Sequence, residues 1–533
     1  MGILIELRDY AGDGKLHAHI LFYATLALLS FGLFLLLKKE FSIHSPTKLP
    51  IAGIESPGYL GILKARFKFV SNGFNIVRDA YHKYPGRNFV VTTYGCDKII
   101  LTHAQVKELA SAPEDVVSIQ HASAETMMIE CTGLGRFLGT GYAEEVVRVK
   151  LTQNLANLKA GILEETRFAL DTELPGCSTD EWRSVEIFTT ILRVVARTSS
   201  RAFVGLPLCR NEDWLTVSIM FTRDVFMTLG KLTHVPKPIR PLFAYIFNSI
   251  GEIRSHKEKA QALLDPIFQS RLEEERLAEK NGTVYQKPND MLQWLTDRVD
   301  PPYKSVESLS ELQLLIILSS IHTMSLALLN TIFDLAEHQE CVQQIREEIE
   351  AVLSANNGVL DSAALRKMKK TDSFLKEALR ARIGLFSFNR MVMKSLTLSD
   401  GTYLPKGVVI AAPTSMFSTD PDFVEDPEKF DGFRWYKKSL EAEGGVLHSN
   451  NFTTTSPNDL TFGHGKHACP GRFFAAEEMK IILVFLLFRY DFKYPEGQSR
   501  PRNLNHGEFS YPDTTKHLLF KKSTGPMKFP FLQ

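Results

Sequence analysis

The chain has 533 residues, of which 44% are hydrophobic, and its formal net charge is +1. A chain of this length and composition can bury a large core, and its balanced charge gives no basis for binding nucleic acid. The six cysteines are scattered without a C-x-x-C pair, which argues against a disulfide scaffold or a zinc site.

Residues 20–37 form the first predicted element. They carry no charge and are just long enough to cross a bilayer as a helix. A cleaved signal peptide is the alternative, but the preceding segment is not basic and no small-x-small cleavage motif follows. Basic residues begin at Lys38 and Lys39, so the positive-inside rule places residues 1–19 in the lumen and the rest in the cytosol. In a eukaryotic cell this pattern predicts a single-pass anchor in the endoplasmic reticulum membrane.

Residues 38–58 are rich in proline and glycine, which interrupt helices, and they are predicted to form a short stiff linker. From residue 59 to residue 533 the sequence shows no repeat, no low-complexity tract and no second linker. We therefore expect residues 59–533 to form one large domain that is mainly α-helical with a minor β component.

Two short β regions are predicted within this domain. Residues 89–95 and 98–102 are β-rich runs separated by a turn, and residues 396–410 contain a hairpin with its turn at Asp400-Gly401. Between these regions, residues 133–141 contain four glycines without G-x-G-x-x-G spacing. This segment is predicted to be a loop rather than a dinucleotide site.

A long helix is predicted from Ser308, where Ser308 and Glu311 form a capping-box pattern, to about His338. Its middle is apolar on nearly all sides, which indicates burial. Several polar residues in this middle need a hydrogen-bond partner or a function: Ser319, Ser320, His322, Thr323 and Ser325.

Residues 461–487 carry the strongest chemical pattern, a glycine-punctuated loop with Cys469, followed by a helix. Pro470 suits the first position of this helix because proline has no N–H to leave unpaired. A cysteine at a helix N-terminus has its thiolate form favoured by the helix dipole and the unpaired N–H groups. Taken alone, Cys469 would still be read as an ordinary buried cysteine.

The surrounding residues change that interpretation. The F-x-x-G-x-x-x-C-x-G pattern resembles the haem-binding signature of the cytochrome P450 family, and its positions are Phe462, Gly465, Cys469 and Gly471. Three further segments match the family in the expected order: the long helix with S-S-I-H-T-M, the K-E-A-L-R segment and the D-P-E-K-F-D-G-F-R-W segment. The resemblance implies the cytochrome P450 fold, with a large domain that binds haem b through Cys469 as the axial thiolate ligand of the iron.

The resemblance also implies roles for residues outside the cysteine loop. Glu377 and Arg380, three residues apart on a helix face, would form a buried triad with Arg434, although Gly432-Phe433 replaces the usual P-E before this arginine. Four more residues are pocket candidates that plain core packing explains equally well: Leu315, Ile383, Leu385 and Phe386.

His467 and Arg390 stand at family positions that bind the haem propionates. Arg148 is a weaker candidate for the same role, because Glu144 stands where the family has tryptophan. For both arginines the alternative is a surface charge.

The distal side of the haem departs from the usual pattern. Thr323 matches the threonine that helps to deliver protons, and its alternative role is to hydrogen-bond its own helix backbone. His322 replaces the acidic residue before that threonine. An imidazole can relay a proton near neutral pH, and the alternative is a satisfied core histidine. The I-H-T pattern is similar to a fungal branch of the family that includes gibberellin-pathway and indole-diterpene oxidases.

The function implied is a monooxygenase that inserts one atom of O₂ into a C–H bond of a lipophilic, terpenoid-type secondary metabolite. Electrons would come from NADPH through a separate cytochrome P450 reductase, with cytochrome b5 as an optional second donor, because the chain shows no flavin or nicotinamide module. Two alternatives stay open: a haem-thiolate isomerase or dehydratase that acts without O₂, and a non-catalytic membrane-bound haem- or lipid-binding protein.

Overall fold

The computed structural model describes residues 49–532 except 57, 94–95, 442–449 and 526–527, together with His19 and residues 21–27 and 30–32. Residues 1–18, much of the predicted anchor at 20–37 and residues 38–48 of the predicted linker lie outside the described residues. Within the anchor, residues 21–27 and 30–32 are helical.

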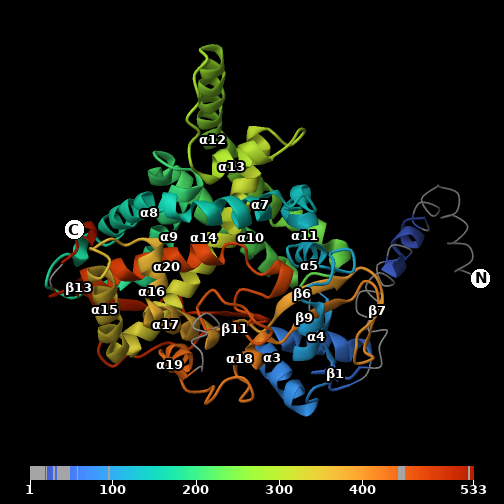
Figure 1. The fold of residues 1–533 in the computed structure, drawn as a ribbon. Coiled ribbons are helices and arrows are strands. Elements are labelled where there is room, and N and C mark those ends of the chain that lie inside the picture. The colour runs from blue at the N-terminus through green and yellow to red at the C-terminus, as the bar shows by residue number, and fades with distance from the viewer. Residues whose placement is uncertain are drawn as a thin grey trace, which may run out of the picture.

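Most of the described chain is helical, as predicted (Figure 1). The helices are α3 (Tyr59–Lys83), α4 (His103–Leu109), α5 (Ile119–Thr126), α6 (Ile129–Thr132), α7 (Tyr142–Glu145), the π-helical η2 (Val146–Leu151), α8 (Thr152–Glu173), α9 (Ile187–Phe203), α10 (Glu212–Thr233), α11 (Arg240–Ile246), α12 (Ser249–Lys280), α13 (Met291–Arg298), α14 (Val306–Glu337), α15 (Gln339–Ser354), α16 (Ser362–Lys367), α17 (Lys369–Arg380), α18 (Thr414–Ser418), α19 (Arg434–Glu441) and α20 (Arg472–Arg489).

The β component is minor and lies largely beside α3 and α4 (Figure 1). One sheet has the strand order β1-β2-β3-β9-β6-β4, a second has the order β10-β13-β5, and β7-β8 and β11-β12 are separate pairs. The strands are β1 (Ile51–Ala52), β2 (Phe89–Thr92), β3 (Asp97–Ile100), β4 (Val117–Ser118), β5 (Arg183–Glu186), β6 (Ser387–Val392), β7 (Leu396–Thr397), β8 (Tyr403–Leu404), β9 (Val409–Ala412), β10 (Tyr490–Lys493), β11 (Leu504–His506), β12 (Phe509–Tyr511) and β13 (His517–Lys522).

Both predicted β regions are present. β2 and β3 pair antiparallel, and β7 and β8 form the hairpin around Gly401, whose φ of +86° suits glycine. The region at 396–410 does not remain one hairpin, however. β9 leaves it to pair with β3 and β6, because Val409 and the rest of β9 are buried in the larger sheet.

Helix α14 confirms the predicted long helix, but the predicted cap was wrong. The helix begins at Val306, and its N-cap is Ser305, whose hydroxyl accepts a hydrogen bond from the backbone N–H of Ser308 at 3.3 Å. Ser308 is buried inside the first turn. Glu311 does not cap the helix, since its carboxylate lies 3.4 Å from the ammonium of Lys257.

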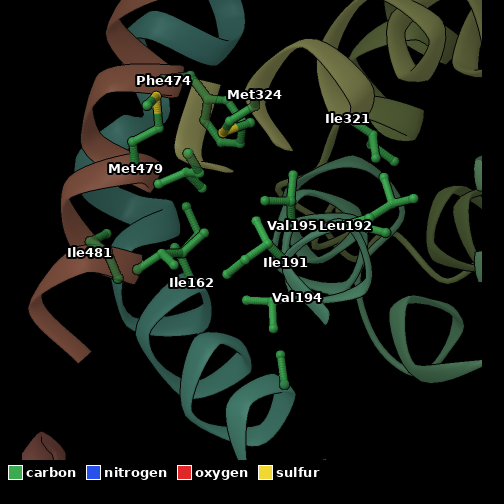
Figure 2. Close-up of a cluster of buried hydrophobic side chains, with 14 of the residues drawn as sticks. Ile162, Ile191, Leu192, Val194, Val195, Ile321, Met324, Phe474, Met479 and Ile481 are labelled. Atoms are coloured by element: carbon green, nitrogen blue, oxygen red, sulfur yellow. The ribbon is translucent and has the colours of Figure 1, made fainter. Parts of the chain in front are cut away.

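The core explains why α14 is apolar nearly all round. Among the described residues α14 is the one helix long and apolar enough to cross a membrane, but 61% of its most apolar window is buried inside the protein. Figure 2 shows side chains from α8, α9, α14 and α20 packed together, including Ile162, Val195, Met324 and Phe474. α14 is therefore the central helix of the buried core.

A buried carboxyl group lies between α20 and α9. Glu478 is 1% exposed, and Ser199 donates its hydroxyl to both carboxyl oxygens, at 2.9 and 3.0 Å. Burial without a cation raises the pKa of Glu478 to about 8. Glu478 is thus protonated in the folded protein at neutral pH.

This raised pKa predicts a pH-dependent loss of stability. Between the ordinary pKa of 4.5 and the folded-state pKa of about 8, the unfolded chain releases the Glu478 proton while the folded chain keeps it. Stability therefore falls as pH rises through this window. The variant Glu478→Gln is expected to match the stability of the wild type near pH 4.5. At pH 8 it should unfold at a higher urea concentration, because its free energy of unfolding exceeds that of the wild type by a few kcal/mol, at ~1.4 kcal/mol per pKa unit. Parallel urea midpoints of the two proteins from pH 4.5 to pH 8.5 would contradict the raised pKa.

Candidate active site

The cysteine loop is held against the end of α4. The backbone N–H of Lys466 donates to the carbonyl oxygen of Ala110 at 3.1 Å. Gly465 has a φ of +74°, and a Cβ at this position would lie 2.1 Å from the same carbonyl oxygen. Only glycine fits this close approach, which gives the predicted role of Gly465 a physical reason.

Cys469 lies immediately before the N-terminus of α20. Its backbone N–H donates to the carbonyl oxygen of Phe462 at 2.7 Å, which closes the loop between the two signature positions. Burial raises the pKa of the Cys469 thiol, but the backbone N–H groups of Gly471 and Arg472 bond to the sulfur and favour the thiolate. The prediction that Pro470 is the first helical residue was wrong. α20 begins at Arg472, with Gly471 as its N-cap.

One stripe of α14 is more accessible than the rest of its middle, which is buried or half-buried. Ser319 and Thr323 are exposed and Leu315 is half-buried, at a spacing of four residues that places all three on one helix face. The next residue, Met324, lies beside Phe474 at the start of α20 (Figure 2).

The two predicted distal residues differ in their bonding. Thr323 donates its hydroxyl to the backbone carbonyls of Ser319 and Ser320, at 2.9 and 3.1 Å, which is the alternative role considered for it. His322 has a buried Nδ1 with no hydrogen-bond partner among the described residues. Burial lowers the pKa of His322 to about 4, so its imidazole is neutral at physiological pH. The part predicted for His322 in proton delivery stays a prediction, with the imidazole neutral.

His467 and Arg390 lie in one buried cluster. Arg390 is 4% exposed on β6, and burial lowers its pKa to about 10, so it remains charged. Burial and, after it, the positive charge of Arg390 lower the pKa of His467. His467 Nε2 lies 3.2 Å from a carboxylate oxygen of Glu114, yet neither ring nitrogen makes a well-aligned hydrogen bond within the described chain.

Arg148 lies at the edge of this cluster on η2. Its side chain is 47% exposed and forms an ion pair with Glu144, four residues earlier. The carboxylate of Glu144 only partly opposes the lowering of the pKa of His467. Arg148 thus has a carboxylate partner of its own. The sequence did not predict that Glu114 or Glu144 belongs to this cluster. For Glu144, the one indication in the sequence was that it replaces the tryptophan usual in the family.

The structure brings the predicted triad together. Glu377 has no exposed surface and accepts from Arg380 at 2.8 and 2.9 Å and from Arg434 at 3.1 Å. Trp435 adds a fourth bond from its indole N–H at 3.2 Å, which the sequence analysis missed. The unusual Gly432 has a steric reason, because a Cβ there would lie 2.5 Å from the ring of Phe374.

The pocket candidates divide into two pairs. Leu385 has no exposed surface and packs in the cluster between the larger sheet and α3, and Phe386 stacks on Phe69 with ring centroids 6.3 Å apart. These two are core residues, which corrects the prediction for Leu385. Leu315 and Ile383 keep partly accessible side chains and remain candidates for the pocket wall.

These residues fit a haem group. The backbone N–H groups of Gly471 and Arg472 oppose the effect of burial on the pKa of the Cys469 thiol, and His467 and Arg390 are donors without aligned carboxylate partners in the described chain. In a holoprotein Cys469 would bind the iron, and His467 and Arg390 would bind the propionates. The bound haem supplies O₂ activation, which a thiolate ligand promotes.

Fold and site together define the class of haem-thiolate oxygenases. The family model for cytochrome P450 matches residues 61–520, and the chain belongs to the cytochrome P450 family. Its members named among the relatives are monooxygenases, and the family cofactor is haem with an axial cysteine thiolate.

The relatives include several fungal enzymes. A cytochrome P450 monooxygenase of Emericella nidulans is 39% identical over 456 residues, covering 85% of this chain and 84% of that protein. The ent-kaurene oxidase of Fusarium fujikuroi is 31% identical over 488 residues, covering 90% and 89%. A solved cyanobacterial cytochrome P450 with bound retinoic acid shares the fold, with a TM-score of 0.65, 18% identity, and coverage of 89% of this chain and 100% of that chain.

Proposed function

We propose that this enzyme inserts one oxygen atom of O₂ into a C–H bond of a terpenoid-type secondary metabolite, with electrons from NADPH through a separate reductase. The observation that carries the proposal is the accessible stripe of α14, which presents Leu315, Ser319 and Thr323 on one helix face. An apolar residue beside two hydroxyls suits a hydrocarbon substrate whose reaction needs protons.

Two further points support the substrate class and the location. Relatives about 31% identical over 90% of this chain are ent-kaurene oxidases, which favours a diterpene or similar hydrocarbon. Residues 20–37 carry no charge and are followed by Lys38 and Lys39, which supports a single anchor in the endoplasmic reticulum membrane with residues 59–533 in the cytosol as one catalytic domain.

Within this site we assign proton positioning to Thr323, whose hydroxyl is bonded to backbone carbonyls and exposed on the stripe. His322 stays neutral, so it can accept a hydrogen bond at Nδ1 rather than hold a positive charge. A neutral buried imidazole also keeps the distal side apolar, which excludes bulk water from the reacting substrate.

Turnover under ¹⁸O₂ distinguishes this proposal from the isomerase or dehydratase alternative. With the full-length protein, a reductase, NADPH and a panel of diterpene hydrocarbons that includes ent-kaurene, we expect a product that contains one ¹⁸O atom and requires NADPH. Mass spectrometry of the product and the rate of NADPH oxidation provide the measurement. An unlabelled product formed without NADPH would support the isomerase or dehydratase, and a haem-loaded protein that turns over no member of the panel would contradict the proposed substrate class.

A further inference from the structure

Lys98 is a buried charge on an apolar face of the larger sheet. Its side chain is 4% exposed, and it lies two residues before Ile100 on β3, so both side chains point to the same face. That face packs in the cluster that contains Phe69 of α3 and Leu385. A lysine is rarely buried without a specific role, because its ammonium loses its hydration there.

The Lys98 ammonium joins two segments that are distant in the chain. It pairs with the Glu508 carboxylate at 2.5 Å and donates to the amide oxygen of Asn389 at 3.1 Å. It also lies 5.3 Å from the centroid of the Phe386 ring, within range of a cation–π interaction. Burial opposes the charge of Lys98, but the Glu508 carboxylate outweighs burial and the pKa of Lys98 is raised, so the ammonium stays charged.

One of these segments belongs to the candidate active site. Residues 383–390, which we call the wall segment, begin at the pocket candidate Ile383 and end at Arg390, the proposed propionate donor. Asn389 directly precedes Arg390, so Lys98 is hydrogen-bonded one residue away from a proposed haem contact.

Glu508 belongs to the tip of the hairpin formed by β11 and β12. Its carbonyl oxygen accepts from the backbone N–H of Leu385 at 2.9 Å, which joins the tip to the wall segment. The N–H of Gly507 donates to the carbonyl oxygen of Val70 on α3 at 2.7 Å, and a Cβ on Gly73 would lie 2.7 Å from the carbonyl oxygen of Gly507. The tip is thus closely packed between α3 and the wall segment, and β11 lies beside α3 in Figure 1.

The chain just before the hairpin is fixed to α14, which carries the accessible stripe. Arg500 donates to the carboxylate of Asp334 at 2.6 Å and to the amide oxygen of Asn330 at 2.8 Å. Asn330 follows Thr323 on α14 by about two helical turns. The hairpin therefore connects α14 to the wall segment, and a buried ion pair holds it at each end.

We propose that Lys98 is a positioning residue for the substrate: through Glu508 and Asn389 it holds the hairpin tip against the wall segment and so determines the fit of bulky ligands. The hairpin leaves two apolar side chains, Leu504 and Phe509, exposed on one face. A bulky ligand of the iron would contact this assembly, and a small one would not. The role does not depend on the terpenoid class of the substrate.

Azole titrations of the full-length holoprotein test the role of Lys98. Imidazole binds the iron alone, whereas clotrimazole also carries a bulky triaryl group, and the shift of the Soret band gives the Kd of each. In Lys98→Met we expect the Kd of clotrimazole to rise about fivefold or more and that of imidazole to stay within about twofold, because only the bulky ligand uses the preorganised wall. An equal change for both ligands, or no change for either, would overturn the proposal.

A double variant and a control separate the position of the hairpin from general stability. Lys98→Met leaves the Glu508 carboxylate unpaired, so Lys98→Met/Glu508→Gln, which removes both charges, is titrated in parallel and should show the same selective loss. Glu55→Gln removes the exposed pairs of Glu55 with Lys64 and Lys68, and both Kd values should stay at those of the wild type. The ferrous–CO spectrum checks the haem site of each variant. Wild-type selectivity in the double variant would overturn the proposal.

Hydrogen exchange of the unaltered holoprotein gives a readout that needs no variant. With clotrimazole bound, backbone exchange in residues 384–390 and 504–511 should be slower than with imidazole bound, because the bulky ligand packs against both segments. Mass spectrometry of the exchanged protein provides the measurement. Equal exchange of these segments with the two ligands would show that the hairpin and the wall segment do not contact the ligand, and the positioning role of Lys98 would be wrong.

Discussion

Replacing Cys469 with alanine is expected to abolish the red-shifted Soret band of the ferrous–CO complex. The band reports an iron bound to a thiolate, and Cys469 is the cysteine whose sulfur receives the N–H groups at the start of α20. Without this sulfur the site retains His467 on the loop and Arg390 on β6, the two proposed propionate donors, so residual haem binding is expected with an unshifted band. Difference spectra of dithionite-reduced, CO-treated protein provide the measurement.

Cys341 offers the matched control. It is a free cysteine that is 6% exposed on α15, and its replacement by alanine should leave the band in place. Cys469→His should restore an axial ligand to the iron but not the red shift, because imidazole replaces the thiolate. If Cys469→Ala kept the full red-shifted band, another residue would have to be the axial ligand and the site would have to be placed elsewhere.

The elements that could be predicted are those in which a local pattern and the tertiary environment agree. α14 is apolar on most sides because most of it is surrounded by core, so the helix could be predicted although its cap could not. The sequence predicted Ser308 as the cap, whereas the structure has Ser305, because the position of the first turn depends on how the helix packs in the protein. The start of α20 is a second example. Pro470 was predicted to be its first residue, but Gly471 is the N-cap and Pro470 lies in the turn before the helix.

The candidate site was predictable where a motif spans few residues and was not predictable where partners are distant in the chain. The Cys469 loop and the Glu377–Arg380 pair are local patterns. Glu114 contacts His467 from a segment about 350 residues earlier, and no sequence pattern predicts that contact. Burial is equally invisible in sequence. His322 could be named as unusual, but the burial that lowers its pKa to about 4 depends on the packing of the surrounding helices.

Replacing Glu377 with glutamine is expected to destabilise the protein strongly and to lower the yield of holoprotein. The carboxylate is completely buried and balances Arg380 and Arg434, which are 6% and 12% exposed. Removing one partner of a buried ion pair leaves an uncompensated charge and typically costs ~3–5 kcal/mol. Two guanidiniums lose their counter-charge here, so the upper part of this range is expected.

An exposed pair of the same spacing separates burial from charge. Glu273 and Arg276 form an i, i+3 pair with side chains that are 53% and 60% exposed. Glu273→Gln should therefore leave the urea midpoint unchanged, since exposed ion pairs contribute little to stability. Haem content per polypeptide and the urea midpoint of both variants provide the measurement. Helices α17 and α19 meet at Glu377. If the Glu377→Gln protein had normal haem content and an unchanged urea midpoint, hydrogen bonds to the amide alone would hold this junction. The charge of the triad would then not be what stabilises it.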